Sequence, residues 1–598
     1  MKLNLEFYKK EKEIEIAEKE IIHQYIEKFS NYDYEENFDE MITDKEIYYL
    51  SSCSQNILNW YPFKKEDEVL EIGGDLGQIT QIFTTKTKEV ITTEPNLEKA
   101  KAIAKRYEKE ENLEIIVGNL QEIKLQKKFD YIVLIGIMPR LKEVIGKNIK
   151  LMDVLKMLES NLKQNGKFLV AVDNQFGLRY FAGNPENMLN QKFKSLTGYS
   201  DEPQRMECFT KSKIKEQLEN INYKANFYYP LPDYRIPNVI FSDKQQAKYN
   251  SVDKYDAYCN ENSTIIMNEI DVFREILKSE EEMFSFFANS FLMEISKQEM
   301  PIKYQYISFN NMRKENYRLI TKITEEYVEK EIVNEKAHKH YDNIKENIDY
   351  MKENKIKTVD YVENGNIKSK YMKQEKLLNN VIVKALENKD QDLVDHIMEQ
   401  YRKILENNTY QEVNYENTVF AKYNIEIEDK EIIQQMHFQK KGLWDMTFKN
   451  CFYLEDEFYF FDQEWMEENL PAEYILYRSI LYTISLRRFV NIEEWFEKYE
   501  LTKYRKIFEA LDNQLQEKIR NHNSWCFYSQ NKYFDIDATK QEIENAQIRS
   551  EAQKAALENL KQENETIRQE YEQYRKIQER KLTNRIKRKV KKVIKKKG

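Results

Sequence analysis

The chain has 598 residues, of which 41% are apolar and 33% are charged, and this length is too great for a single hydrophobic core. No apolar run approaches the roughly 18 residues of a membrane-spanning helix, and the charged first twenty residues lack the apolar centre of a signal peptide. Five scattered cysteines without metal-ligand spacing indicate a reduced, cytoplasmic protein without structural zinc. We therefore expect two or three domains.

The formal net charge of −9 is unevenly distributed along the chain. The segment Arg580–Gly598 holds eleven lysines and arginines and no acidic residue, so its charge of +11 leaves −20 for the rest. A strongly acidic body does not suit general nucleic-acid binding, and we expect no nucleic-acid partner. The basic tail is predicted to act separately.

Residues 1–65 are predicted to be mostly helical, and they lead into an apolar strand at 68–72. Three glycines, Gly73, Gly74 and Gly77, follow this strand before a segment that can open a helix. Glycines in such a turn let the backbone approach a ligand closely. A second apolar strand, 89–93, ends in Glu94, whose carboxylate is at the right distance to accept hydrogen bonds from both hydroxyls of a ribose. The alternative is an ordinary strand–helix turn without a ligand.

This pattern resembles the class I S-adenosylmethionine-dependent methyltransferases, whose first motif reads acid-x-Gly-x-Gly-x-Gly. Glu71, Gly73 and Gly77 match the motif, while the middle glycine is displaced to Gly74. Further strands are expected near 113–117, 129–134 and 165–172, which implies a doubly wound Rossmann-like α/β sheet with residues 1–65 as a lid over the cofactor. The resemblance implies S-adenosylmethionine as cofactor, bound by Glu71, Gly73, Gly74, Gly77, Glu94, Asn119, Leu120 and Gly136.

A polar loop at 173–183 follows the fifth strand, at the sheet edge where open α/β sheets bind their substrates. Asn174 and Arg179 are the candidates for acceptor contacts, and an ordinary surface loop is the alternative. The segment 228–237 packs three prolines and three tyrosines together. With the preceding loop it resembles methyltransferases of bacterial surface-polysaccharide synthesis, in which the tyrosines would stack on sugars or simply pack. Residues 284–295 are expected to form a buried helix.

Residues from 301 onward contain a second pattern, which begins with alternating strands at 304–309 and 317–323. Asp445, Asn450 and Asp462 have the Asp-x-x-x-x-Asn spacing and strand-borne Asp of protein-kinase-like phosphotransferases. In that α+β fold the first Asp takes the proton of the attacking hydroxyl, and Asn450 and Asp462 would hold Mg²⁺ against ATP. Lys330 would bind phosphate oxygens and pair with Glu335, and residues 375–378 would form the hinge.

Two features depart from the kinase pattern. Leu443 stands where a histidine is usual, and residues 310–316 contain no glycine-rich phosphate loop. A degenerate kinase-like domain without activity is one alternative, and a chance spacing without the fold is another.

The end of the chain, from about residue 541, has no glycine or proline before Gly598. A heptad seam over 543–574, with Asn564 as a polar position, predicts a long helix that forms a coiled coil and a homo-oligomer; a lone solvated helix is the alternative. Aliphatic residues then recur every three or four positions among lysines, which is typical of a helix on an anionic membrane. RNA binding is the rival interpretation of this tail.

The whole order resembles the bifunctional kinase–methyltransferases that terminate bacterial O-antigen polysaccharide. That resemblance implies a kinase that phosphorylates the terminal sugar and a methyltransferase that caps the phosphate, on a glycan or lipid-linked polysaccharide acceptor, with glycosyltransferases as partners on the inner face of the plasma membrane. A phosphomonoester is largely dianionic at neutral pH and needs no general base to attack a sulfonium methyl group. There are two alternatives. One is a membrane-tethered scaffold with a pseudokinase domain that recruits glycosyltransferases, and the other is an RNA methyltransferase.

The predicted segments are a helical lid (1–65), a methyltransferase domain (66–250), a helical connection (251–300), a kinase-like domain (301–537), a coiled coil (538–579) and a basic amphipathic tail (580–598).

Overall fold

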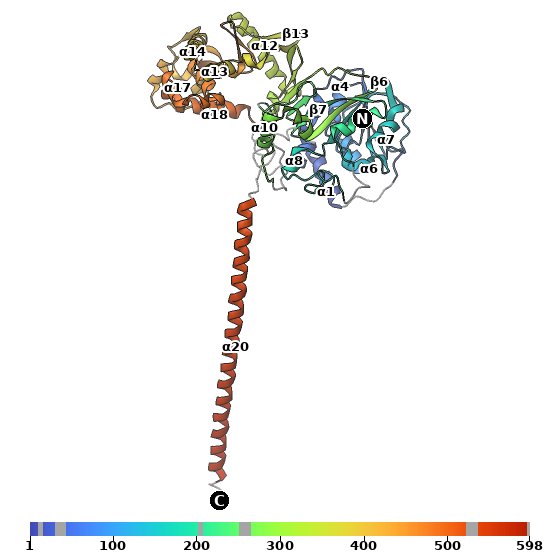
Figure 1. Cartoon of the computed structure of the whole chain (residues 1–598), viewed down its shortest axis with the longest axis vertical. Coiled ribbons are helices and arrows are strands. Elements are labelled where there is room, and N and C mark those ends of the chain that lie inside the picture. Colours follow the sequence, from blue (N-terminus) through green and yellow to red (C-terminus); the bar gives the residue numbers. More distant parts are fainter. Residues whose placement is uncertain are drawn as a thin grey trace. The chain divides into compact units, whose positions relative to one another are not determined.

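The computed structural model of the chain describes residues 1–9, 16–29, 44–200, 207–249, 251, 265–521 and 536–594. The chain divides into two compact units, Met1–Asn531 and Lys532–Gly598. Figure 1 shows the whole chain coloured along its sequence.

The front of the first unit is built on seven strands in the spatial order β4-β3-β2-β5-β6-β9-β7. Strands β2 to β6 run parallel to one another, whereas β9 runs antiparallel to both β6 and β7. Parallel neighbours require a crossover connection, and the alternation of strands and helices in the sequence supplies it. This order confirms the predicted doubly wound α/β sheet. The strand bounds are β2 Glu68–Ile72, β3 Glu89–Glu94, β4 Leu113–Val117, β5 Phe129–Leu134, β6 Leu162–Asp173, β7 Lys224–Leu231 and β9 Ser290–Ser296.

The central strands bury side chains on both faces of this sheet. Leu70 and Ile132 lie in one hydrophobic cluster, and their sequence neighbours Val69 and Val133 lie in another. A period of two along each strand sends alternate residues to opposite faces. The consecutive apolar residues 69–70 of β2 and 132–134 of β5 are therefore what a sheet covered on both sides requires. The helices along this part of the chain are α4 Thr80–Lys86, α5 Leu97–Arg106, α6 Leu141–Ile145, α7 Leu151–Leu158, α8 Leu178–Phe181, α9 Lys211–Glu219 and α10 Glu269–Ser279.

Two predictions about the segment 251–300 need correction. The expected helix over 284–295 is wrong in its second half, because α11 (Phe284–Phe287) is short and β9 follows it. All seven residues of β9 are buried, and this strand pairs with β6 along its whole length. The segment predicted as a helical connection therefore contains a central strand of the sheet.

The same sheet continues into the region predicted to be kinase-like, and it has fourteen strands in all. Beyond β7 the strands are β8 Val239–Ser242, β10 Tyr306–Phe309, β11 Leu319–Ile323, β12 Tyr327–Ile332, β14 Asn366–Lys370 and β13 Asp360–Glu363. At the opposite edge β1 (Lys2–Asn4) pairs with β4, so part of the predicted helical lid is a strand. The rest of that segment holds α1 Ile16–Phe29, α2 Asp44–Leu50 and α3 Asn56–Asn59.

Residues 338–519 form a largely helical region with its own core, in which Tyr401, Trp444, Phe448 and Tyr477 are buried. Figure 1 shows its helices α13, α14, α17 and α18 gathered in the orange part of the chain. The helices are α12 His338–Glu353, α13 Leu378–Glu387, α14 Gln391–Glu406, α15 Val419–Lys422, α16 Ala472–Leu481, α17 Ile492–Lys498 and α18 Arg505–Ile519. A small sheet joins β15 Thr409–Tyr410, β16 Phe438–Leu443 and β19 Met466–Pro471, and β17 Cys451–Leu454 pairs with β18 Glu457–Phe460.

The second unit contains one continuous helix, α20, over Ile536–Ile594. Its 59 residues make it about 88 Å long. The predicted long helix is confirmed, and its heptad side chains, such as Leu557 and Ile567, are more than half exposed within the single chain. The coiled coil itself stays a prediction. No helix in the described part of the chain is long and apolar enough to cross a membrane.

Candidate functional sites

The turn after β2 has a shape that glycine alone fits. Gly73 and Gly77 have φ angles of +71° and +74°, in the left-handed region that side chains disfavour. At Gly74 the obstacle is space, since an added Cβ would lie 2.3 Å from Cγ2 of Thr92. The Gly73 and Gly74 amides donate to the carbonyl of Thr93 at 2.9 and 3.0 Å, which ties the turn to the end of β3. The three predicted glycines thus shape one turn.

Glu71 holds this turn from inside. Its Oε2 accepts hydrogen bonds from the hydroxyls of Thr80, at 2.8 Å, and Thr92, at 2.7 Å. Burial raises the pKa of Glu71 to about 7, although the two hydroxyls lower it. The carboxyl was predicted to bind cofactor, but it is buried and engaged with neighbouring elements. Its role here is to fix the turn.

Glu94 lies fully buried at the end of β3, where the sequence predicted a ribose acceptor. Its Oε2 accepts from the backbone amide of Asp75 at 2.9 Å, and its Oε1 accepts from the amide of Asn96 at 3.1 Å. Arg140 also donates to Oε1, at 2.7 Å. Burial raises the pKa of Glu94, while the Arg140 guanidinium lowers it. The carboxylate is therefore held in place by groups that sequence reasoning missed.

Arg140 follows β5 and joins three carboxylates. Besides Glu94, its guanidinium pairs with Asp75 at 3.1 Å and with Glu143 at 2.8 Å. Lys99 also pairs with Asp75, at 2.9 Å. Asp75 stands in the sequence where the motif has its middle glycine, and this aspartate could have indicated the cluster. A buried carboxylate requires cationic partners. Arg140 and Lys99 supply them.

Helix α2 contacts the turn, and its role as a lid over the cofactor stays a prediction. The Tyr49 hydroxyl donates to Asp75 at 3.0 Å, and Gln78 donates to the Tyr48 hydroxyl at 2.9 Å. Gly136 has a φ of +72°, and an added Cβ there would lie 3.0 Å from the Tyr48 hydroxyl oxygen. Residues 30–43 of the predicted lid lie outside the described residues.

A cavity of about 410 Å³ lies beside Arg140, and Asn119 lines it. The amide of Gly118 donates to the Glu94 carbonyl at 3.2 Å, so Asn119, which follows β4, lies next to the end of β3 that carries Glu94. Leu120 is buried in the core, and its amide donates to Val144 at 3.0 Å. The structure therefore brings Asn119 to the candidate site, whereas Leu120 serves packing.

The two residues predicted to contact the acceptor, Asn174 and Arg179, lie inside the protein. Asn174 is buried, and its Nδ2 donates to the carbonyls of Phe286 and Ala288, each at 2.7 Å. Arg179 is equally buried and pairs with Asp233. Both side chains hold the loop after β6 against neighbouring segments, because a buried polar group needs partners. The tyrosines of the segment 228–237 are also buried, so they pack and do not present sugar-stacking faces.

A small cavity at the end of β6 is lined by residues other than Asn174 and Arg179. Asp173 lines it together with Gln175, Tyr199 and Cys208. Burial raises the pKa of Asp173, and Asn187 donates to both of its oxygens, at 3.0 and 2.9 Å. The sequence placed a polar loop at this edge correctly but could not tell which of its neighbouring residues face the cavity.

The second candidate site gathers around Lys330 on β12. Its ammonium pairs with Asp462 and with Glu464, which is nearly fully buried. Arg313 and His340 also contact Glu464. Burial raises the pKa of Glu464, but Arg313, Lys330 and the contact with His340 together lower it well below the usual range. The structure thus brings Lys330, which was predicted to bind phosphate oxygens, next to Asp462, which was predicted to bind Mg²⁺, and both roles stay predictions.

Glu335 does not pair with Lys330 as predicted. It is exposed in a short 3-10 helix, Glu335–Ala337, ahead of α12. Glu464 takes the predicted place of Glu335 as the buried carboxylate beside the lysine. Glu464 lies two positions after Asp462 in the same polar segment, and this position was the feature of the sequence that could have indicated it.

Asp445 and Asn450 occupy one tight turn. The Asn450 Nδ2 donates to the Asp445 carbonyl at 3.1 Å, and Gln463 donates to the same carbonyl at 3.0 Å. The Asp445 carboxylate lies 3.3 Å from Arg478. Burial raises the pKa of Asp445, which Arg478 partly offsets. Gln463 ties this turn to the segment that carries Asp462.

The comparisons with known proteins concern the front of the chain. Residues 46–226 match the family model described as a methyltransferase domain. Residues 46–226 form a methyltransferase domain. The prediction of a Rossmann-like methyltransferase is therefore confirmed by this match and by the strand order, and the match supports S-adenosylmethionine as the methyl donor. No curated protein sequence matches the chain significantly.

Solved structures similar to this chain include methyltransferases. One is an S-adenosylmethionine-dependent methyltransferase from Aquifex aeolicus, at 12% identity, covering 34% of this chain and 88% of that one, with a TM-score of 0.23. Another is an S-adenosylmethionine-dependent methyltransferase from Thiobacillus denitrificans in complex with S-adenosylhomocysteine, at 10% identity, 41% and 88% coverage and a TM-score of 0.23.

Proposed function

We propose that the chain joins its S-adenosylmethionine-dependent methyltransferase to an ATP-dependent phosphotransferase, and that both act on the end of a bacterial surface polysaccharide. In this proposal the terminal sugar hydroxyl is phosphorylated first, and the new phosphate is then methylated. Such a cap removes the hydroxyl from which the polysaccharide would grow, so it ends elongation. The family resemblance of the whole chain supports this reading.

The observation that carries the phosphotransferase part is the pairing of Lys330 with Asp462 beside the Asp445–Asn450 turn. The lysine and the aspartate lie 132 positions apart in the sequence. Their meeting supports one site, in which a cation for phosphate oxygens, a metal-binding carboxylate and a candidate base are brought together.

The residues present fit Mg²⁺ with a nucleoside triphosphate. Oxygen ligands suit Mg²⁺, and Asp462 offers a carboxylate that is 39% exposed. The Nδ2 of Asn450 is engaged by the Asp445 carbonyl, which leaves its side-chain oxygen as the candidate ligand. When bound, ATP with Mg²⁺ would supply the phosphoryl group. Asp445 would accept the proton of the sugar hydroxyl, and its raised pKa favours that task near neutral pH.

The methyltransferase site fits a nucleoside whose ribose reaches Glu94. S-adenosylmethionine would supply a methyl group bound to a sulfonium. A phosphate oxygen of the acceptor would form the new bond to the methyl carbon as the carbon–sulfur bond breaks and S-adenosylhomocysteine leaves. The phosphate attacks as an anion, so this step requires no proton transfer from a protein base.

The tail belongs to the same proposal. The exposed heptad side chains of α20 would form a coiled coil that makes the chain a homo-oligomer, and the basic amphipathic end would hold it on an anionic membrane surface. Glycosyltransferases that extend lipid-linked polysaccharide at the inner face of the plasma membrane would then be close partners.

One observation favours the scaffold alternative, in which the kinase-like region has no activity. The segment between β10 and β11, at the position of a phosphate loop, is fastened to the front of the chain. Asn311 accepts from Asn56 at 2.7 Å and donates to the Pro237 carbonyl at 3.1 Å. A loop fixed in this way has little freedom to close over a nucleotide.

A reconstitution with purified protein tests the proposal. The protein is incubated with Mg²⁺, ATP labelled in the γ-phosphate, methyl-labelled S-adenosylmethionine and a synthetic oligosaccharide with a free terminal hydroxyl. We expect phosphate on the oligosaccharide, and methyl transfer that depends on that phosphate. An oligosaccharide already phosphorylated at its end should be methylated without ATP. If the protein neither binds nor consumes Mg-ATP, the scaffold alternative replaces the phosphotransferase, and methyl transfer to RNA would overturn the polysaccharide assignment.

A further inference from the structure

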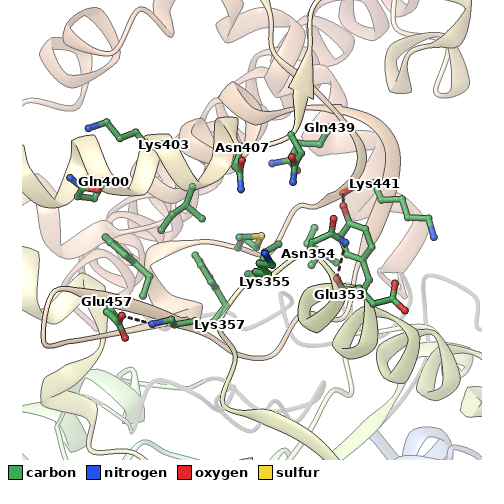
Figure 2. Close-up of a pocket in the computed structure, with 18 of the residues that line it drawn as sticks. Glu353, Asn354, Lys355, Lys357, Gln400, Lys403, Asn407, Gln439, Lys441 and Glu457 are labelled. Carbon is green, nitrogen blue, oxygen red and sulfur yellow. Dashed lines mark hydrogen bonds and ion pairs between the residues drawn. The ribbon is translucent and has the colours of Figure 1, made fainter.

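A cavity of about 710 Å³ lies in the helical region, separate from the residues of both candidate sites. It is bounded by the end of α12, by α14, by β16 and by the hairpin of β17 and β18. Figure 2 shows this cavity. Its volume lies within the range of small-ligand sites in proteins.

Five amide side chains are among the polar groups that line the cavity. Figure 2 shows Asn407 and Gln439 pointing into it from the side of α14 and β16. Asn354, Gln400 and Asn408 also line it. An amide offers both donors and an acceptor, which matches the hydroxyl groups of a sugar better than it matches a phosphate or an apolar ligand.

Lysines surround the mouth of the cavity. Lys355, Lys440 and Lys441 are exposed lining residues, and within the described part of the chain none of the three lies within ion-pair distance of a carboxylate. Two further lining lysines are already paired, Lys357 with Glu457 and Lys403 with Glu399. The lining also holds three carboxylates, of which Glu457 pairs with Lys357 and Asp456 with His396. The three remaining lysines therefore outnumber the one further carboxylate, Glu353, and give the rim a net positive charge on a body that is otherwise strongly acidic.

Apolar side chains form the floor. Phe458 and Phe460 are buried there, next to Leu443 and Met446. Leu443 and Met446 stand on either side of the Trp444–Asp445 pair, and the Met446 amide donates to the Leu443 carbonyl at 3.2 Å. A ligand in the cavity would therefore touch the turn that carries Asp445, from a side that Asp445 itself does not line.

We propose that this cavity binds an acidic oligosaccharide segment, with sugar hydroxyls on the amides and carboxylate or phosphate groups on the lysine rim. The inference rests on the proposed action on a bacterial glycan, and it adds that the glycan carries acidic groups and is held at a second place. Binding there would keep a long polymer close while its end reacts. A nucleic acid fits less well, because the cavity's phenylalanines are buried and offer no exposed face for base stacking.

Calorimetric titration of the full chain, without ATP or S-adenosylmethionine, tests this inference. The probes are a hexamer of galacturonic acid, a neutral glucose hexamer and an RNA hexamer. We expect the acidic hexamer to bind, and to bind more weakly as salt rises. The triple variant Lys355→Gln, Lys440→Gln, Lys441→Gln should lose about tenfold or more in affinity, since each exposed cation contributes modestly. Asn407→Ala should weaken binding about fivefold, the effect of one lost hydrogen bond.

The matched control is the triple variant Lys339→Gln, Lys373→Gln, Lys376→Gln, which removes the same charge from exposed lysines outside the cavity. It should bind the acidic hexamer as the parent chain does. The inference is overturned if the acidic hexamer does not bind, if both triple variants lose affinity equally, or if the RNA hexamer binds more tightly. The titration involves no transfer reaction. Its outcome can therefore be interpreted even if the protein proves inactive in one or both proposed reactions.

Discussion

Arg140 donates to Oε1 of Glu94 at 2.7 Å, on the carboxylate that the sequence predicts as the ribose acceptor. The same guanidinium contacts Glu143 at the protein surface. One arginine thus joins a fully buried carboxylate to a half-exposed one that lines the neighbouring cavity. This arrangement allows the two carboxylates to be compared directly.

Replacing Glu94 with alanine should weaken S-adenosylmethionine binding by about 2–3 kcal/mol, the cost of losing a charged hydrogen-bond acceptor and leaving Arg140 with less compensation. Glu143→Ala is the matched control, because it removes another carboxylate partner of Arg140, and it should change affinity by no more than about 0.5 kcal/mol. Calorimetry on both folded variants measures the difference. Equal affinities for the two would remove Glu94 from the cofactor site.

Glu71 should make stability fall as pH rises. Its pKa is raised to about 7 in the fold, above the ordinary 4.5, so the native state binds the extra proton between these values. Ionising the buried Glu71 lowers the free energy of unfolding. This loss is absent below about pH 4.5, grows between pH 4.5 and pH 7, and is complete above about pH 7, where it is at most about 3 kcal/mol. Glu71→Gln keeps an acceptor for both threonines and should reduce this slope in urea unfolding between pH 5 and pH 8, where Asp360, whose pKa is raised to about 6, contributes the remainder.

Glu68, on the same strand, provides the opposite control. Lys163 and Lys127 lower its pKa to about 2, so its contribution to stability is present above pH 4.5 and is lost as pH falls towards 2. Glu68→Gln should leave the slope between pH 5 and pH 8 unchanged. If Glu71→Gln and the parent chain show parallel stabilities over that range, then Glu71 is not the buried acid that titrates.

Phosphoryl transfer should depend on Asp445 and Asp462. Asp462→Asn should abolish Mg²⁺-dependent turnover of ATP, and Asp445→Asn should slow it at least about a hundredfold, as expected for a metal ligand and a general base. Glu335→Gln serves as the control, because the exposed Glu335 is not paired with Lys330. Turnover unaffected by either aspartate substitution would exclude this site as the catalytic centre.

The basic end of α20 should bind anionic membranes. Five aliphatic residues at helical spacing each contribute about 1–2 kcal/mol in a bilayer interface, and each cation near the surface adds about 1 kcal/mol. We expect the protein to sediment with anionic liposomes, to ignore neutral ones and to dissociate as salt rises towards about 1 M. The five residues are Leu582, Ile586, Val590, Val593 and Ile594.

A chain shortened to residue 579 is the matched comparison for the tail. It should stay in solution with anionic liposomes, remain an oligomer through the predicted coiled coil and keep its activity on soluble acceptors. Tight, steeply salt-dependent binding of RNA by the full chain, without binding to liposomes, would replace the membrane interpretation.

The sequence predicted those parts of the fold that depend on local pattern. Apolar runs of period two gave the strands, and glycines at Gly73, Gly74 and Gly77 gave the turn, because these positions restrict the backbone whatever surrounds them. The sequence predicts a helix over 284–295, because periodicity alone does not separate a short, fully buried strand from a buried helix segment. The pairing of β9 with β6 decided the outcome.

The sequence by itself therefore determined a glycine turn followed by Glu94, a doubly wound sheet and a long terminal helix. Only the tertiary structure decided which charged side chains meet, because partners such as Lys330 and Glu464 lie 134 positions apart among many lysines and glutamates. The tertiary structure also places Asn174 inside the protein, where it donates to two backbone carbonyls of a remote segment. No local sequence pattern encodes such a long-range contact. Burial and pairing are decided by packing, and packing joins segments that are remote in sequence.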